Sequence, residues 1–178
     1  DNDGGYSIVG DNCNDIWLIK TDSSGNNIWQ RTFGGSGYEA AFSSQQTSDG
    51  GYIIAGQTYS YGAGGSDAWL IKTDSIGNKT WDKTFGGSYL DTASSVQQTS
   101  DGGYVVAGWT DGGAWLIKTD TAGNQIWDRT FEDADYAHSV QQTSDKGFII
   151  AGSSINDASF WDACLIKTDS AGNKIWDK

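Results

Sequence analysis

One phrase of this sequence is written four times, nearly unchanged. The chain of 178 residues contains "WLIKTDSSGNNIWQRTFGG" from Trp17, "WLIKTDSIGNKTWDKTFGG" from Trp69, "WLIKTDTAGNQIWDRTF" from Trp115 and "CLIKTDSAGNKIWDK" from Cys164. The starting positions are 52, 46 and 49 residues apart, which is the period of a small supersecondary unit. A single unit of this kind cannot cover its own apolar surface, so the copies must stack on one another.

A second phrase alternates with the first. It reads "SSQQTSDGGYIIAG" from Ser43, "SVQQTSDGGYVVAG" from Ser95 and "SVQQTSDKGFIIAG" from Ser139, and only its tail, "NDGGYSIVG", precedes the first copy of the other phrase. Each complete repeat therefore predicts four short strands, near "SVQQT", "YIIAG", "AWLIKTD" and "KIWDKTF". The turns "SDGG" and "DSxGN" supply glycine or asparagine where a positive φ is needed. No segment shows a helical period.

A four-stranded antiparallel sheet repeated every 46–52 residues is typical of a β-propeller blade. We predict an all-β chain with four blades, at approximately 1–35, 36–87, 88–131 and 132–178, forming one propeller domain or propeller segment. The first blade lacks its inner strand, so fifteen strands are expected. The tryptophan in the last strand of each repeat is expected to pack over a glycine turn of the next blade. These residues are Trp29, Trp81, Trp127 and Trp176.

The phrase "LIKTDSxGNxIW" resembles the tryptophan-docking signature of quinoprotein-like propellers. The whole unit, "DGGY…AG…DAWLIKTD…GN…W…TFGG", is similar to repeats of secreted archaeal and bacterial propeller proteins. This resemblance covers essentially the whole chain and implies a propeller fold in a secreted or cell-surface protein. One column departs from the signature: the usual threonine before the turn glycine is replaced by Ser24, Ile76, Ala122 and Ala171.

Charge narrows the choice of partner. The formal net charge is −12, so phosphate backbones and anionic membranes would be repelled. No apolar run is long enough for a transmembrane helix. Basic proteins, neutral sugars and cations suit such a chain better. With two cysteines and a single histidine, His138, neither a zinc site nor a catalytic triad is expected.

The connections between repeats vary most in length and composition. Between the second and third strands the distance is 7 residues from Gly10 to Trp17 but 13 from Gly56 to Trp69. In a propeller these loops and the blade-to-blade connections emerge on one face, and variable loops on a rigid scaffold often bind ligands. The predicted binding residues are Tyr59, Tyr61, Asp67, Trp109, Asp111, Phe160, Trp161 and Asp162, with Asp15 and Asp157 as further acids on the same face. Alternatively, these loops vary because nothing constrains them.

A second group of acids recurs just before the inner strand of each complete repeat. Glu39, Asp91 and Asp135 occupy this column. Carboxylate oxygens are suitable ligands for Ca²⁺, so a ring of these residues near the mouth of the channel could bind that ion. The alternative is that each carboxylate caps a turn between blades. No other cofactor is indicated.

Together these features favour an extracellular, non-catalytic recognition or scaffolding propeller that binds a protein. One alternative is a lectin-like module that binds glycans. Another is a domain of a secreted polysaccharide-active or quinone-dependent enzyme, with Asp67 and Asp162 as an acid–base pair. The absent inner strand suggests that the chain is part of a longer array. The ring is then completed by a second copy, giving a homodimer with eight blades, or the four blades close on themselves.

Overall fold

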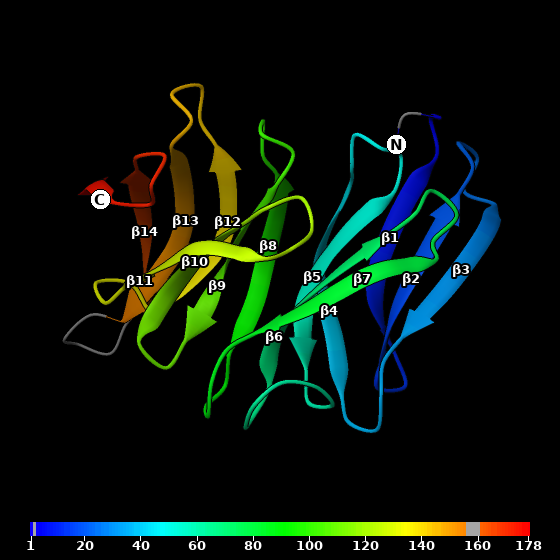
Figure 1. The fold of residues 1–178 in the computed structure, drawn as a ribbon, viewed down its shortest axis with the longest axis horizontal. Coiled ribbons are helices and arrows are strands. Elements are labelled where there is room, and N and C mark those ends of the chain that lie inside the picture. The colour runs from blue at the N-terminus through cyan, green and yellow to red at the C-terminus, as the bar shows by residue number, and fades with distance from the viewer. Residues whose placement is uncertain (2, 156–160) are drawn as a thin grey trace.

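The computed structural model describes residues 1, 3–155 and 161–178. Within these ranges it contains fifteen strands and no helix (Figure 1), which confirms the predicted all-β class and strand number. The described part of the chain accordingly has no helix of the length and apolarity required to cross a membrane.

The strands form four antiparallel sheets, one for each repeat. Within each sheet, strands that follow one another in the sequence are hydrogen-bonded neighbours. The first sheet holds β1 (Tyr6–Asn12), β2 (Asp15–Thr21) and β3 (Asn27–Phe33). The second sheet holds β4 (Glu39–Gln46), β5 (Tyr52–Thr58), β6 (Asp67–Thr73) and β7 (Lys79–Phe85), and the third holds β8 (Thr92–Gln98), β9 (Tyr104–Thr110), β10 (Gly113–Thr119) and β11 (Gln125–Phe131). The fourth sheet holds β12 (Tyr136–Gln142), β13 (Phe148–Ile155), β14 (Trp161–Thr168) and β15 (Lys174–Asp177).

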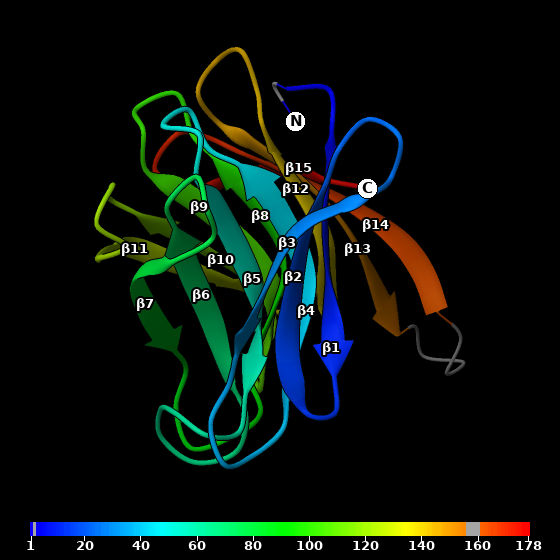
Figure 2. The ribbon, with the colours of Figure 1, turned by 90° about the vertical axis from the view of Figure 1, so that its right-hand side faces the viewer.

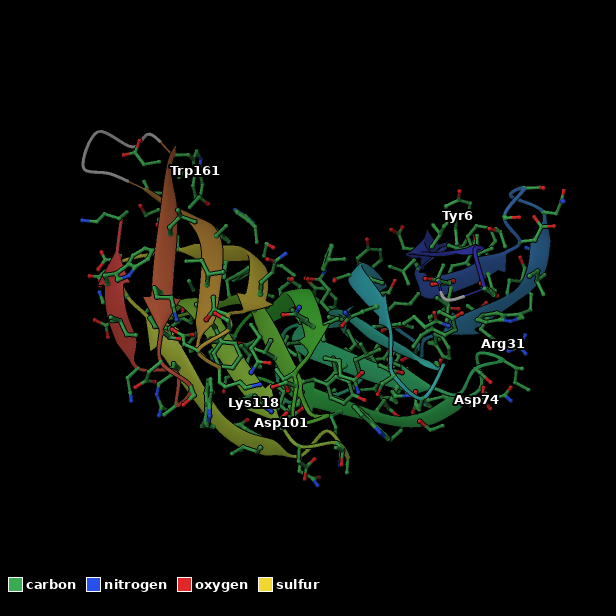
Figure 3. The ribbon with its side chains drawn as sticks, turned by 90° about the horizontal axis from the view of Figure 1, so that it is seen from above. Tyr6, Arg31, Asp74, Asp101, Lys118 and Trp161 are labelled. Carbon is green, nitrogen blue, oxygen red and sulfur yellow. The ribbon has the colours of Figure 1, made fainter. Side chains whose placement is uncertain are left out.

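The four sheets stand side by side in a crescent (Figure 3). The first strands of the complete repeats, β4, β8 and β12, are neighbours along its inner side. They are joined by hydrogen bonds from the backbone of one strand to glutamine side chains of the preceding strand. The amide of Gln98 donates to Oε1 of Gln45 at 2.6 Å, and the amide of Gln142 donates to Oε1 of Gln97 at 2.6 Å. The recurring "QQ" of the sequence therefore joins the sheets at the hub.

Each inner strand carries a β-bulge. The pairing register with the next strand shifts between Ala41 and Ser43 in the second sheet, and at the equivalent place in the third and fourth. One residue per inner strand is thereby left out of the ladder. The bulged residues are Phe42, Ser94 and His138.

The apolar cores lie between sheets rather than within them. Ile53, Leu70 and Phe85 of the second sheet pack against Val106, Trp115 and other residues of the third. Similar clusters join the first sheet to the second and the third to the fourth. The two central sheets are covered on both faces, which explains why "YII" and "WLI" are continuously apolar instead of alternating.

In each of the first three sheets, the tryptophan of the last strand lies against a glycine of the next sheet. A Cβ added at Gly77 would lie 2.7 Å from Cζ3 of Trp29, and the same close approach joins Trp81 to Gly123 and Trp127 to Gly172. The guanidinium of Arg31 covers the ring of Trp29 at 5.4 Å, a cation–π distance. Only a residue without a side chain leaves room for this ring.

Aspartates fix the turns as the sequence indicates. In the β6–β7 turn, Oδ1 of Asp74 accepts hydrogen bonds from the amides of Ile76 at 3.0 Å and Asn78 at 2.8 Å. In the β4–β5 turn, Asp49 accepts a hydrogen bond from Nζ of the buried Lys72 at 2.8 Å. The same lysine–aspartate pair recurs in the other three sheets. The "LIK" lysines thus pair with acids of the neighbouring turn.

The two ends of the crescent do not meet. Figure 3 shows the first and fourth sheets at opposite tips, and the apolar clusters of the described residues join only consecutive sheets. The alternative of a four-bladed ring closed on itself is therefore wrong for this chain. The reason is geometric: Trp176 and the glycine turn of the first sheet do not reach one another, so the last join of a ring is not made.

The tryptophan–glycine contact can be tested with two alanine substitutions in one sheet. Gly77 and Gly50 both have a left-handed φ, 83° and 82°, but a Cβ at Gly50 would meet only Ser75 at 3.7 Å. Gly50→Ala should cost roughly 1–2 kcal/mol of unfolding free energy through backbone strain alone. Gly77→Ala should cost roughly 1–3 kcal/mol more, because Trp29 must move. Urea denaturation of both variants measures the difference, and equal losses would contradict the contact.

Candidate functional site

The variable loops lie at one end of the sheets. Figures 1 and 2 show the β3–β4, β5–β6 and β7–β8 connections gathered at the lower end, opposite the short turns. Residues 156–160, in the connection from β13 to β14, lie outside the described residues. The predicted candidates Phe160 and Asp157 fall within them.

The β5–β6 loop, residues 59–66, rests on the connection that precedes its own sheet. The amide of Tyr59 donates to the carbonyl of Tyr38 at 3.0 Å, and the amide of Gly37 donates to Oγ of Ser60 at 2.7 Å. The hydroxyl of Tyr61 donates to the carbonyl of Gly34 at 2.9 Å. These bonds tie the β5–β6 loop to the β3–β4 connection that leads into the same sheet, so the two segments form one surface.

Three aromatic rings are presented on this surface. Tyr38, Tyr59 and Tyr61 are 40%, 49% and 43% exposed, and we call them the tyrosine surface. The rings of Tyr38 and Tyr59 are 6.4 Å apart. The ring of Tyr61 packs against the buried Trp69 at 5.4 Å, so the scaffold core supports it. The tyrosine surface is supported from below by Trp69 and is exposed above.

A second aromatic group lies on the fourth sheet and the neighbouring strand of the third. The ring of Tyr136 is 5.4 Å from Trp109 and 5.2 Å from Trp161. The imidazole of His138 lies parallel to Tyr136 at 6.3 Å, and its Nε2 is 2.9 Å from Oγ of Ser153. Trp161 is 57% exposed. His138, the bulged residue of its strand, thus has a partner of its own within the sheet.

The structure brings some predicted residues together and separates others. Tyr59 and Tyr61 share one surface, while Trp109 and Trp161 share another. Asp111 and Asp162 are exposed, but Asp67 is only 2% exposed. Asp67 on β6 and Asp162 on β14 belong to sheets separated by the third sheet, so the acid–base pair considered from the sequence does not form.

Two residues of these groups, Tyr38 and Tyr136, escaped the sequence analysis. Both stand at the end of a connection between repeats, next to or at the start of an inner strand. The signal was available: the phrases "GGSGYEAA" and "EDADYAH" each place a tyrosine next to the acid that precedes the inner strand. For Tyr38, its meaning depended on knowing that this connection packs against the β5–β6 loop, which follows it in the sequence.

Buried carboxylates meet in pairs at the joins between sheets. A Cβ added at Gly86 would lie 2.4 Å from Oδ2 of Asp91 and 2.7 Å from Oδ1 of Asp67. Gly34 is similarly enclosed by Asp15 and Glu39. Gly113 of the third sheet occupies the column of Asp67. In the same repeat Phe131 is followed by Glu132, whereas Phe85 is followed by Gly86. Glu132 is exposed, so it does not replace the buried aspartate, and the described residues do not repeat this carboxylate pair at the join between the third and fourth sheets.

These carboxylates have hydrogen-bond donors from the protein. Oε2 of Glu39 accepts from the amide of Gly35 at 2.9 Å, and Oδ2 of Asp91 accepts from the amide of Gly87 at 2.8 Å. Oδ2 of Asp135 accepts from the amide of Ile155 at 2.6 Å. Glu39 and Asp91 each cap the turn before their inner strand, whereas Asp135 accepts from the last residue of β13. The described residues contain no group of three acids, histidines or cysteines arranged to hold a metal. Binding of Ca²⁺ stays a prediction, which a melting curve with and without chelator would check.

Burial raises the pKa of Asp67 above its ordinary value. The hydrogen bond from the amide of Ala63 opposes this effect, and the negative charge of Asp91 raises the pKa of Asp67 further. A carboxylate whose folded pKa is raised binds its proton more tightly in the folded state than in the unfolded state. Ionisation of Asp67 therefore destabilises the fold, and stability declines as the pH rises through this pKa.

This chain is similar in fold to solved structures of β-propeller proteins. The WD40 domain of Pan2 from Neurospora crassa superposes with a TM-score of 0.63 and 12% identity over 98% of this chain. The fold is that of a β-propeller. Sqt1 from Chaetomium thermophilum, bound to the N-terminus of the ribosomal protein L10, gives a TM-score of 0.61 with 12% identity over 96% of this chain. A second structure of Sqt1 gives 0.57 and 15% over 96%.

This chain spans about half the length of these propellers: it covers 50% of the Pan2 domain, and 45% and 42% of the two Sqt1 chains. No family model and no curated protein sequence matches it. The comparisons thus support the propeller fold, whereas the quinoprotein-like and secreted type remains a hypothesis that rests on the sequence resemblance.

Replacing Asp67 tests the buried carboxylate pair. Asp67→Asn keeps an oxygen that can accept from the amide of Ala63 but removes the charge facing Asp91. At neutral pH the variant should match or exceed the wild-type stability, by on the order of 1 kcal/mol. Its melting temperature should also vary less with pH above the ordinary aspartate range. Asp111→Asn, in an exposed turn, is the control; a large loss of stability in Asp67→Asn at every pH would refute this account.

Proposed function

We propose that this chain is a non-catalytic scaffold that binds a basic segment of a partner protein through the tyrosine surface. The observation that supports it best is the set of three exposed rings held by hydrogen bonds between two loops. Tyrosine is enriched at protein interfaces because it offers a large contact area with little loss of side-chain entropy. The proposal includes the secreted or cell-surface location that the sequence resemblance implies.

The negative charge of this chain favours a positively charged partner. The chain carries a formal net charge of −12, and the acids Asp111 and Asp162 of the third and fourth sheets are exposed. Such a surface attracts lysine- and arginine-rich segments and accelerates their association at low salt. Arginine side chains can also stack on tyrosine rings. Among propellers of this fold, Sqt1 binds the N-terminus of the ribosomal protein L10, which gives a precedent for a terminal protein segment as ligand.

A displayed peptide library tests this proposal directly. We expect the selected peptides to be basic, to bind the wild-type chain more weakly as salt rises, and to lose affinity by at least about tenfold for the double variant Tyr38→Ser, Tyr59→Ser. Ile76→Ser is the control variant, since Ile76 is 55% exposed but lies in a turn at the opposite end of the sheets. Peptides that bind this control as weakly as the double variant would count against the tyrosine surface.

Exposed tyrosine rings beside carboxylates also suit sugars, so a glycan array carries the second candidate function. Glycans that bind the wild-type chain and not the double variant, without any selected peptide, would favour the lectin-like alternative. Failure of both peptides and glycans to depend on Tyr38 and Tyr59 would remove the tyrosine surface as a binding site.

A further inference from the structure

The fourth sheet exposes the face that each other sheet buries against its successor. We call this side the trailing face of a sheet. Leu18, Leu70 and Leu116 on the trailing faces of the first three sheets are each fully buried. The equivalent Leu165 of the fourth sheet is 43% exposed, and Trp176 is 40% exposed. The fourth sheet therefore presents an apolar side that has no successor among the described residues.

The first sheet exposes the opposite, or leading, face. Tyr52 and Ile54 on the leading face of the second sheet are buried to 1% and 0% against the first sheet. Their counterparts in the first sheet, Tyr6 and Ile8, are 57% and 51% exposed. Figure 3 labels Tyr6 at one tip of the crescent and Trp161 at the other. The two open faces thus lie at opposite ends of the chain's arc.

The three internal joins show what each open face accepts. At each join a tryptophan of the earlier sheet lies over a turn glycine of the later one. The same tryptophan meets an aromatic ring of the later sheet edge-on: Trp29 is 5.7 Å from Tyr52, Trp81 is 5.8 Å from Tyr104, and Trp127 is 5.8 Å from Phe148. Trp176 is the corresponding ring of the fourth sheet, and Gly25 with Tyr6 are the corresponding acceptors in the first.

The acceptor glycine of the first sheet is unoccupied. Gly25 has φ 83°, close to the 83°, 77° and 80° of Gly77, Gly123 and Gly172. Those three are buried under tryptophans, whereas Gly25 is exposed and a Cβ added there would meet nothing within 4 Å. The turn is therefore already in the conformation that receives a tryptophan ring, although no ring of this chain lies there.

We propose that two copies of this chain associate head to tail, with Trp176 of each copy packed over Gly25 and against Tyr6 of the other. Leu165 of one copy would then cover the side of the first sheet that carries Ile8. The chain matches about half the length of the propellers of similar fold, so two crescents complete one ring with two equal joins. A head-to-tail interface forms a closed ring when its rotation closes and a filament when it does not.

Charge predicts the salt dependence of this association. Each copy carries a formal net charge of −12, so two copies repel one another over long range, while the open faces are apolar. Salt screens the repulsion and leaves the apolar contact largely unchanged. Dimerisation should therefore strengthen with added salt, in contrast to the binding of a basic peptide. The proposed dimer is also independent of what the tyrosine surface binds.

Sedimentation velocity of the 178-residue chain tests the proposal. The wild-type chain should reach twice its monomer mass of 19.1 kDa as concentration or salt rises. Trp176→Ala should raise the dimer dissociation constant by at least about thirtyfold, as expected for a central aromatic anchor. Ile126→Asp is the matched control, because Ile126 is 58% exposed but lies on an inner sheet. Circular dichroism melting of the monomers verifies that each variant is folded.

Mixing two variants distinguishes head-to-tail association from any symmetric face-to-face dimer. Gly25→Ala places a methyl group where the ring must lie, so this variant and Trp176→Ala should each fail to dimerise alone. In an equimolar mixture one join is intact, between Trp176 of the Gly25→Ala chain and Gly25 of the Trp176→Ala chain. Recovery of dimers in the mixture is the expected result. A wild-type chain that stays monomeric, a control that dissociates equally, or a mixture without dimers would overturn the proposal.

Discussion

The tryptophan ring that lies over a glycine of the next sheet is the contact on which this architecture depends. A sheet of this size is too thin to cover both of its apolar sides, and neighbouring sheets must therefore be held at one fixed distance and angle. The ring of Trp81 and the bare backbone of Gly123 set that distance, while the edge of Tyr104 sets the tilt. The inner glutamines join the sheets at the hub, and the tryptophans join them at the rim.

Much of this arrangement could be predicted from the sequence, because every element recurs in the same order. Periodic spacing indicated the number of strands, and "SDGG" and "DSxGN" indicated turns with a positive φ, which Gly50 and Gly77 have. The hydrogen bonds that the aspartates of these turns accept from backbone amides are seen in the structure. The packing of Trp29 over a glycine turn of the next sheet was also predictable, since a large ring and a residue without a side chain recur in every repeat. In a repeat protein each position of the repeat occurs several times, so the residues that the fold requires can be recognised by comparing the copies. A domain without repeats does not allow this comparison.

The candidate site could be predicted less well, because it lies where the repeats differ. Each variable loop differs from its counterparts in the other repeats, so its conformation cannot be inferred by comparing the repeats. It also depends on neighbouring segments that the sequence does not identify. Asp67 illustrates this: its type suggested a ligand-binding acid, yet it is buried and caps its own loop through the amide of Ala63. Tyr38 was missed because its contact with Tyr59 lies just beyond the β4–β5 ladder, where a connection and a long loop meet in a way that no other repeat shares. The exposure of Leu165 and Tyr6 at the ends of the crescent could not be predicted either, because the burial of these residues depends on which sheets are adjacent.

The β-bulge in each inner strand leaves one residue outside both the strand pairing and the glutamine hydrogen bonds between sheets. Ladder residues of β4, β8 and β12 must suit both their own sheet and the glutamine bonds of the hub, so they hardly change between repeats. The extra residue takes no part in the ladder, and it is Phe42 in one sheet, Ser94 in the next and His138 in the last. Each four-stranded sheet thereby holds one position near the axis whose side chain can change without disturbing the strand pairing.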